Sequence, residues 1–363
     1  MPPPLQASAE ESTRLRIAVM GAGSIGCHLG GLLAATCEVT LIGRPHALDT
    51  FSKEGFELTR PGHQSVHIGT EVRLATSAKA AAGADYVLVT VKSRDTRRAA
   101  LELASWLTPG ATVVSLQNGL RNPATLREVL PDHPVLAGMV PYNVVRTSPR
   151  SFHQGTGGAL MIEEAPLAEP LADALHQAGV PARLRPDMPQ VQQAKLLMNL
   201  NNAINALSGL PLKEQLTQRG YRTCLALCQR EALRAFRAEG LRPAKLGPLP
   251  PTLTPHLLRM PDWLFRRIAA PMLAIDDQAR SSTWEDLQRG RPTEVDDLQG
   301  EIVELARQHG LNAPANTALL KLVHLAERIP AAELPALSGP QLLAKCVQRG
   351  RIRRRPGRAG TSR

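Results

Sequence analysis

Short apolar runs alternate with amphipathic segments along the first half of the chain. Runs rich in β-branched residues stand at 16–20, 38–42, 85–91 and 111–116, and the segment 93–107 has helical spacing. A strand, a helix and a second strand in this order predict a parallel sheet whose faces are covered by helices. The pattern predicts further strands at 66–68, 72–74, 135–140 and 159–162, and a helix at 167–178.

A glycine-rich turn joins the first strand to a helix predicted to begin near Ser24. Gly21, Gly23 and Gly26 have the G-x-G-x-x-G spacing, which permits a tight turn and a close approach to a pyrophosphate. Together with the strand at 38–42, the turn predicts a Rossmann-type dinucleotide-binding domain. Two alternatives stay open here. One is a glycine turn without a ligand, and the other is a membrane helix, because 17–37 contains no Asp, Glu, Lys or Arg.

The residues that follow the second strand bear on which dinucleotide binds. NAD-binding domains usually place a carboxylate there for the ribose 2′-hydroxyl, whereas a 2′-phosphate prefers a cation. This chain has Arg44 and no acid until Asp49. We therefore expect Arg44 to bind the 2′-phosphate and NADPH to be the cofactor; an ordinary exposed arginine is the alternative.

From about residue 190 the pattern becomes helical, after a proline-rich seam at 181–189. We expect a flexible arm at 1–13, a Rossmann NADPH-binding domain at 14–187, an all-helical substrate and dimerisation domain at 188–348, and a disordered tail at 349–363. That tail carries seven arginines and no acid. A proline-rich interruption within 240–275 is expected to form a flap or an oligomer surface.

Composition narrows the class of protein. The chain has 363 residues, 43% hydrophobic and 21% charged, as expected of a folded globular protein with two domains. Much of the net charge of +11 lies in the tail, and only 3% of residues are aromatic, so no nucleic-acid or membrane partner is expected. Five scattered cysteines argue against a disulfide framework and favour the cytoplasm. Cys224 and Cys228 lack nearby partners for a metal site.

Polar residues follow the predicted strands and recur on a predicted helix. Lys92 follows one strand and Asn118 another, at the sheet edge where open parallel sheets bind ligands. Farther along, Lys195, Asn199 and Asn202 fall within roughly 60° of one another on a helix, whereas Asn205 is turned about 80° from the lysine. A substrate-facing stripe and a solvated polar stripe are both open interpretations.

Two further clusters stand near the end of the helical half. Ser281 or Ser282 suits the N-cap of a helix, with Glu285 or Asp286 in its first turn. Thr293 suits the cap of the next helix, with Asp296 at the spacing of a capping box. Carboxylates and hydroxyls at adjacent helix starts also suit the wall of a substrate cleft.

In their order and spacing these motifs resemble the ketopantoate (2-dehydropantoate) 2-reductase family. The resemblance runs from the glycine turn to about Glu327. It rests on Gly21, Gly23, Gly26, Arg44, Lys92, 117–119, the 195–205 helix, 281–282, 293–296 and the Pro314-x-Asn316-Thr317 motif. It implies a Rossmann domain followed by a helical domain, with the active site between them. The implied reaction is NADPH-dependent reduction of the C2 ketone of ketopantoate to pantoate, in the biosynthesis of pantothenate and coenzyme A.

The resemblance also implies roles for individual residues. Lys195 would be the general acid, and Glu294 would hold the substrate hydroxyl and help to position Lys195. Ser282 would bind the carboxylate, and Asn199, Asn118 and one further helix asparagine would bind other polar groups. The cofactor would be bound by Gly21, Gly23, Ser24, Ile25, Gly26, Arg44, Lys92 and Asn118. No metal is implied.

One departure from the family pattern puts the substrate in question. Family members often carry an asparagine eight residues after the lysine, where this chain has Ala203. Asn202 or Asn205 must take its place, and helix geometry favours Asn202. A paralogous reductase of another 2-oxo acid is therefore an alternative, and so is a nucleotide-binding regulatory protein without turnover.

The cofactor hypothesis is tested by replacing Arg44 with alanine. We expect Arg44→Ala to lower the preference for NADPH over NADH, because the cation for the 2′-phosphate is lost. The apparent affinities of wild type and variant for both cofactors measure this. An unchanged preference would remove Arg44 from the cofactor site.

Overall fold

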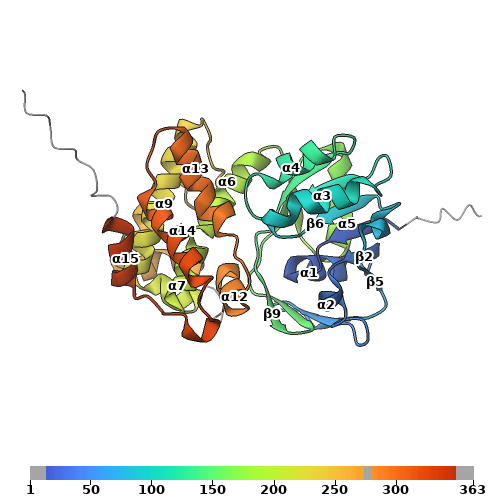
Figure 1. The fold of residues 1–363 in the computed structure, drawn as a ribbon, viewed down its shortest axis with the longest axis horizontal. Coiled ribbons are helices and arrows are strands. Elements are labelled where there is room, and N and C mark those ends of the chain that lie inside the picture. The colour runs from blue at the N-terminus through green and yellow to red at the C-terminus, as the bar shows by residue number, and fades with distance from the viewer. Residues whose placement is uncertain (1–13, 274–275, 277–278, 349–363) are drawn as a thin grey trace, which may run out of the picture.

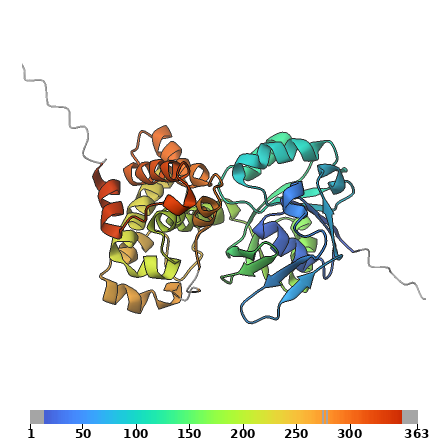
Figure 2. The same cartoon turned by 60° about the horizontal axis from the view of Figure 1, so that its bottom comes forward.

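The computed structural model describes residues 14–273, 276 and 279–348. The expected arm at 1–13 and the expected tail at 349–363 lie outside these residues. The described chain forms two lobes, one built on β-sheets and one built of helices, with α6 (Met188–Asn199) and α12 (Ser282–Gln288) at their junction (Figure 1). The same two lobes lie side by side in the rotated view of Figure 2.

A large sheet of eight strands organises the first lobe. Its order is β12-β11-β8-β7-β6-β1-β2-β5, and every neighbouring pair is parallel except β8 with β11. The strands are β1 (Arg16–Met20), β2 (Glu38–Ile42), β5 (Val72–Ala75), β6 (Tyr86–Val89), β7 (Thr112–Ser115), β8 (Val135–Met139), β11 (Leu160–Glu163) and β12 (Ala182–Arg185). The predicted parallel sheet is confirmed. β12 lies within the proline-rich stretch at 181–189, before the expected domain boundary at 187/188.

Helices cover both faces of this sheet, as the buried strands require. On one face lie α3 (Thr96–Ala104) and α4 (Asn122–Val129), and on the other lie α1 (Ser24–Leu33) and α5 (Glu169–Gln177) (Figure 1). A four-residue helix, α2 (Pro45–Leu48), follows β2. The helix expected across 93–107 is α3, preceded by a short 3₁₀ turn at Ser93–Asp95.

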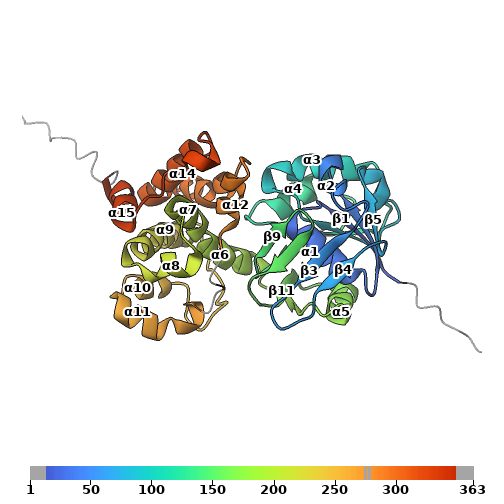
Figure 3. The ribbon, with the colours of Figure 1, turned by 90° about the horizontal axis from the view of Figure 1, so that it is seen from below.

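The structure contains a second sheet of four strands, of which the sequence analysis predicted one. Its order is β4-β3-β10-β9, formed by β3 (Phe56–Thr59), β4 (Val66–Ile68), β9 (Val144–Ser148) and β10 (Ser151–Gln154). It lies across α1 on the side away from the large sheet (Figure 3). Only β4 was predicted; β3, β9 and β10 contain polar residues and their pairing joins segments far apart in the chain.

Two glycines of α1 let it pack between the sheets. A Cβ at Gly30 would come within 2.9 Å of Leu41 in the large sheet, and one at Gly31 within 2.8 Å of Leu58 in the small sheet. The backbone of α1 therefore packs directly against leucine side chains of both sheets, and this burial explains why the helix is apolar and uncharged. The membrane alternative for 17–37 is wrong, since these residues form β1, the glycine turn and α1. Within the described residues, no helix combines the length and apolar character needed to cross a bilayer.

The second lobe consists of helices packed around α9 (Arg219–Ala238). The others are α6 (Met188–Asn199), α7 (Asn201–Ser208), α8 (Leu212–Thr217), α10 (Thr254–Leu258), α11 (Asp262–Ile268), α12 (Ser282–Gln288), α13 (Glu301–Gln308), α14 (Pro314–Ala326) and α15 (Gly339–Gln348). The lobe has its own hydrophobic core, which includes the free thiols of Cys224 and Cys228. Each lobe therefore buries hydrophobic residues of its own, which supports the predicted fold class.

The interruption within 240–275 packs on α9, which differs from the expected flap. The Arg222 side chain of α9 is fully buried and donates to the carbonyls of Leu258, at 3.1 Å, and Met260, at 2.8 Å. It also pairs with Asp262 at 2.8 Å and lies over the Phe265 ring. These contacts attach α10 and α11 to the helical core.

The buried carboxylate of Glu231 caps the start of α14. Its oxygens accept from the backbone N–H groups of Ala315, at 2.8 Å, and Asn316, at 3.0 Å, and from the Asn316 side-chain amide at 2.8 Å. No side chain of α14 itself caps this end. The Pro314-x-Asn316 motif is thereby explained as a helix start capped from a neighbouring helix.

We expect Glu231→Ala to lower the free energy of unfolding by about 2–4 kcal/mol, because buried donors lose their acceptor. Urea unfolding monitored by circular dichroism measures the change. Glu333→Ala, in an exposed carboxylate of the 3₁₀ turn at Ala331–Glu333, serves as the matched control and should leave stability unchanged. Equal losses in the two variants would contradict the capping role.

Candidate active site between the two lobes

The candidate site forms where the carboxyl ends of β6 and β7 meet the helical lobe. Lys92 and Ser93 follow β6, and Asn118 follows β7. Opposite them lie Asp286 of α12 and Glu294, which precedes a five-residue π-helical turn at Asp296–Gly300. π-Helical turns often mark functional positions because they shift the helix register locally.

Lys92 is held between two carboxylates of the helical lobe. Its Nζ lies 2.9 Å from Asp286 Oδ2 and 3.3 Å from Glu294 Oε2. Burial alone would lower the pKa of Lys92, but the charges of Glu294 and Asp286 outweigh it and raise that pKa. The backbone N–H of Ser93 also donates to Glu294, at 3.3 Å. Lys92 is therefore a cation whose charge is matched across the junction.

Asn118 extends this network to α6. Its Nδ2 donates to Glu294 at 3.3 Å, and its Oδ1 accepts from Asn199 Nδ2 at 3.1 Å. Gly119 has a φ of +92°, which a glycine adopts without strain, so the chain turns directly after Asn118. The structure thus brings together four of the predicted site residues: Lys92, Glu294, Asn118 and Asn199.

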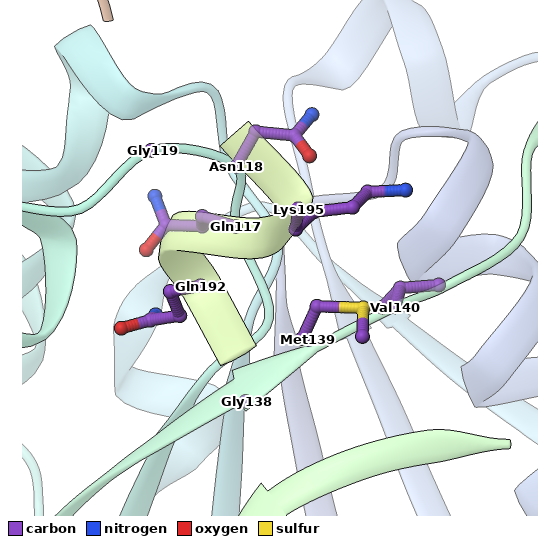
Figure 4. A pocket seen from close by; sticks show the side chains of 8 residues that line it. All are labelled: Gln117, Asn118, Gly119, Gly138, Met139, Val140, Gln192 and Lys195. Atoms are coloured by element: carbon purple, nitrogen blue, oxygen red, sulfur yellow. The ribbon is translucent and has the colours of Figure 1, made fainter. Parts of the chain in front are cut away.

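Lys195 of α6 lies in an adjoining small cavity. The cavity is lined by Gln117, Asn118, Gly119, Gly138, Met139, Val140, Gln192 and Lys195 (Figure 4). The polar ends of Lys195 and Asn118 project to one side of it, and those of Gln117 and Gln192 to the other (Figure 4). Among the described residues the Lys195 ammonium has no hydrogen-bond or ion-pair partner, and desolvation lowers its pKa to about 8. Glu294, expected to position Lys195, contacts Lys92 instead in this structure.

The helix that carries Lys195 ends earlier than predicted. α6 ends at Asn199 and α7 begins at Asn201, with Leu200 between them. At the break, the backbone carbonyl of Leu200 accepts a hydrogen bond from the side-chain amide of Gln299 at 2.8 Å. A residue of the π-helical turn thus satisfies this carbonyl. The single helix expected over 192–205 is therefore wrong.

The structure gives the two candidate asparagines after this break different surroundings. Asn205 is fully buried, donates to the Leu210 carbonyl at 2.9 Å and accepts from the Ser281 N–H at 2.9 Å. Asn202 is half-buried, and its backbone carbonyl, not its side chain, accepts from the Ser281 hydroxyl at 3.1 Å. Because the Asn205 side chain is occupied by the fold, Asn202 keeps its place as the substrate-contact hypothesis.

The two predicted caps have different outcomes. Ser281 is the N-cap of α12, accepting from the Trp284 N–H at 3.2 Å, and half-buried Ser282 is the first residue of that helix. Thr293 does not form the expected box with Asp296. Its hydroxyl accepts from the Val295 N–H at 3.2 Å and donates to Glu327 at 2.8 Å, because the π-helical turn displaces the helix start to Val295.

The glycine turn fits a dinucleotide pyrophosphate. Gly21 has a φ of +123°, and a Cβ at Gly26 would lie 1.9 Å from the Gly21 carbonyl oxygen, so neither position accepts a side chain. A Cβ at Gly23 would meet nothing within 4 Å, which leaves room for a ligand. No side chain caps α1, so Ser24, Ile25 and the N–H groups of its first turn are available to an anion.

Arg44 stands at the end of β2, as a 2′-phosphate ligand should. Its side chain is 59% exposed and pairs with Asp95 at 3.3 Å. Asp95 also contacts Arg98 at 3.0 Å, so Arg44 shares this carboxylate and retains donors for another anion.

The sequence analysis missed the place of Asp286 in the site. It treated Asp286 only as a first-turn acid of a helix, whereas the structure places it closer to Lys92 than Glu294 is. The available signal was its spacing of four residues from Ser282, which puts both side chains on one face of α12.

Comparison with known proteins agrees with this geometry. Residues 17–166 match the family "Ketopantoate reductase PanE/ApbA", and residues 187–327 match its C-terminal domain. The chain belongs to the ketopantoate reductase family. The resemblance inferred from the motifs is thereby confirmed, and so is the fold class.

Individual relatives place this member within the family. The chain is 31% identical to 2-dehydropantoate 2-reductase of Halobacterium salinarum over 324 residues, covering 86% of this chain and 99% of that protein. A PanE/ApbA family ketopantoate reductase structure from Ralstonia eutropha is 33% identical, with a TM-score of 0.74 and coverages of 86% and 99%. A D-mandelate dehydrogenase, solved with NADH and anilino(oxo)acetate, shares the fold with a TM-score of 0.73 at 18% identity, with the same coverages. The family and the more similar relatives are named for the reduction of 2-dehydropantoate, and the dehydrogenase adds a shared fold only.

We expect Lys92→Ala to lower the free energy of unfolding by about 1–3 kcal/mol at about pH 8, since two poorly exposed carboxylates lose their partner. Burial raises the pKa of Asp286, and without Lys92 beside it that pKa rises further, so the loss should shrink as the pH falls to about 5.5 and the Asp286 carboxylate takes up a proton. Urea unfolding at both pH values measures this. The exposed Lys53→Ala is the control, and a pH-independent loss would contradict the ion-pair assignment.

Proposed function

We propose that this family member uses NADPH to reduce the C2 ketone of a 2-oxo acid, with 2-dehydropantoate (ketopantoate) as the leading substrate and pantoate as the product. That reaction belongs to the biosynthesis of pantothenate and coenzyme A. The observation that supports it best is Lys195, which lies beside the residues that follow β7 and β8, has no partner among the described residues and has a pKa lowered to about 8.

Lys195 suits a general acid for ketone reduction. A bound nicotinamide supplies the hydride, and negative charge then develops on the ketone oxygen. An ammonium aimed at that oxygen stabilises the transition state more than the ground state and gives up its proton there. A pKa near 8 keeps most of the ammonium protonated at neutral pH while making it a stronger acid than an ordinary lysine.

The remaining site residues suit substrate binding and positioning. In this proposal Ser282 binds the carboxylate, Asn199 and Asn202 bind further polar groups, and Glu294 receives the substrate hydroxyl. Asn118 and Lys92 lie beside the nicotinamide and ribose. Asn118 already contacts Asn199 and Glu294, so it aligns residues from both lobes around one position.

The preference for NADPH is part of the proposal. It is supported by Arg44 at the end of β2, where no carboxylate follows the strand to receive a ribose 2′-hydroxyl. Gly21, Gly23, Ser24, Ile25 and Gly26 would hold the pyrophosphate.

A paralogous reductase of another 2-oxo acid is the second candidate. Ala203, which is buried, stands where family members often carry an asparagine, so the contact expected from that asparagine falls to Asn202 and the polar groups facing the substrate are arranged differently. A regulatory protein without turnover is less well supported, because binding a nucleotide would not require Lys195, Ser282 and Glu294 in the helical lobe.

We further propose a cytoplasmic homodimer formed through the helical lobe. Trp263 is 70% exposed, and Ile268 and Leu253 are about half exposed, all within one segment of that lobe. A second copy would remove this apolar surface from water. The five buried free thiols suit a reducing compartment.

The function is tested by following NADPH oxidation at 340 nm with ketopantoate and with other 2-oxo acids. We expect turnover with ketopantoate, a loss of at least about 10²-fold in kcat for Lys195→Ala, and a fall of wild-type kcat/KM as the pH rises through about 8. The fall follows because the acid loses its proton above its pKa.

Lys321→Ala, on the exposed side of α14, is the matched control and should retain wild-type turnover. A Lys195→Ala variant with near wild-type kcat would exclude the general-acid role. Turnover with another 2-oxo acid but not with ketopantoate would favour the paralogous reductase, and binding of NADPH without oxidation would favour the regulatory protein.

A further inference from the structure

A second hollow opens between the lobes, and none of the site residues described above lines it. It has a volume of about 430 Å³ and is lined by Arg146, Ser148 and Pro149 of the small-sheet hairpin and by Arg289 at the end of α12. None of these lining residues is acidic, and two of them carry a guanidinium. The hollow is therefore lined by positive charge contributed by both lobes.

Arg146 is held in place by groups without negative charge. Its Nε donates to the Pro149 carbonyl at 3.1 Å, and its Nη2 donates to the same oxygen. The guanidinium lies 5.7 Å from the centre of the Phe51 ring and 5.6 Å from that of Phe152. It has no ion-pair partner in the part of the chain that the structure describes. Its orientation is thus set while its charge remains available.

Arg289 approaches Arg146 from the helical lobe. Its Nη2 donates to the backbone carbonyl of Arg146 at 3.2 Å, and its Nη1 lies 3.5 Å from Glu285 Oε2. Burial raises the pKa of Glu285 to about 7, so this carboxyl neutralises Arg289 only in part near neutral pH. Desolvation and the charges of Arg289 and Arg291 lower the pKa of Arg146, which is the expected effect of like charges held together.

Two guanidiniums held at a shared hollow repel each other unless an anion lies between them. Forked N–H donors from two sides also match the oxygens of a carboxylate or a phosphate. We propose that Arg146 and Arg289 form a binding site for a carboxylate or phosphate group, which bridges the two lobes when bound.

The position of Arg289 suggests where such a group would come from. Ser282, Asp286 and Arg289 recur at helical spacing on α12 and lie within roughly 60° of one another. Arg289 is thus on the face of α12 that carries Ser282 and the Lys92 partner. The anion is either the far end of a substrate, a phosphate of the cofactor, or a separate small anion. Only the first source rests on the proposed function.

Binding is measured first, without any turnover. Inorganic phosphate and glutarate are titrated by calorimetry and thermal shift into the full chain at constant ionic strength, with chloride as the reference. We expect saturable binding in the wild type, weakened at least about 10-fold in Arg289→Gln and in Arg146→Gln, because each removes charge-assisted hydrogen bonds. Arg289→Lys should keep part of the affinity.

Arg267→Gln, on the exposed face of α11, is the control for loss of one positive charge and should bind like the wild type. Arg289 is at the exposed end of its helix, so its variants test the site even if Arg146→Gln fails to fold. Equal affinity in wild type and Arg289→Gln, or equal weakening by Arg267→Gln, would overturn the proposal.

Inhibition kinetics then separate the three sources, each of which requires the binding just described. Competition of glutarate or phosphate with the 2-oxo acid assigns the site to the far end of the substrate, and competition with NADPH assigns it to a cofactor phosphate. Inhibition or activation competitive with neither assigns it to a separate anion. If no 2-oxo acid is reduced, the proposed function fails while the binding measurements still decide the anion site.

Discussion

The ion pairs of Lys92 across the junction are the contacts on which the site depends. Lys92 belongs to the sheet lobe, and Asp286 and Glu294 belong to the helical lobe. Glu294 also accepts from Asn118, which in turn contacts Asn199 on α6. Charge matching therefore does two things at once: it joins the lobes, and it orients the polar side chains that face the reacting position.

Two lysines near this junction show how surroundings decide the chemistry of one side chain. Lys92 and Lys195 are both removed from much of the solvent, which by itself favours the neutral amine. Two carboxylates outweigh this effect at Lys92 and raise its pKa, whereas Lys195 has no described partner and its pKa falls to about 8. One lysine is therefore suited to holding charge in place and the other to releasing a proton.

The glycines of α1 supply the second constraint. Gly30 and Gly31 let the helix contact both sheets, and Gly21 and Gly26 let the chain turn tightly before it. Close packing of α1 places its uncapped N-terminus at the edge of the sheet that faces the helical lobe. The same packing supports the small sheet, whose hairpin carries Arg146 to the junction.

The sequence by itself determined the parallel sheet, the glycine turn and the change to helices near residue 190, because these depend on local periodicity and spacing. The roles proposed for the site residues came from the resemblance of the motifs to the family. Only the tertiary structure decided the rest. The small sheet, β12 and the break at Leu200 depend on partners distant in the chain, such as Gln299, which no local pattern reveals. Two contacts likewise join residues of different lobes: the ion pair of Lys92 with Asp286, and the hydrogen bond of Arg289 to Arg146. The burial of Lys195 without a described partner also depends on how the lobes meet. These side chains are buried and paired only when the two lobes pack against each other, so their exposure and their pKa values cannot be read from the sequence of either segment alone.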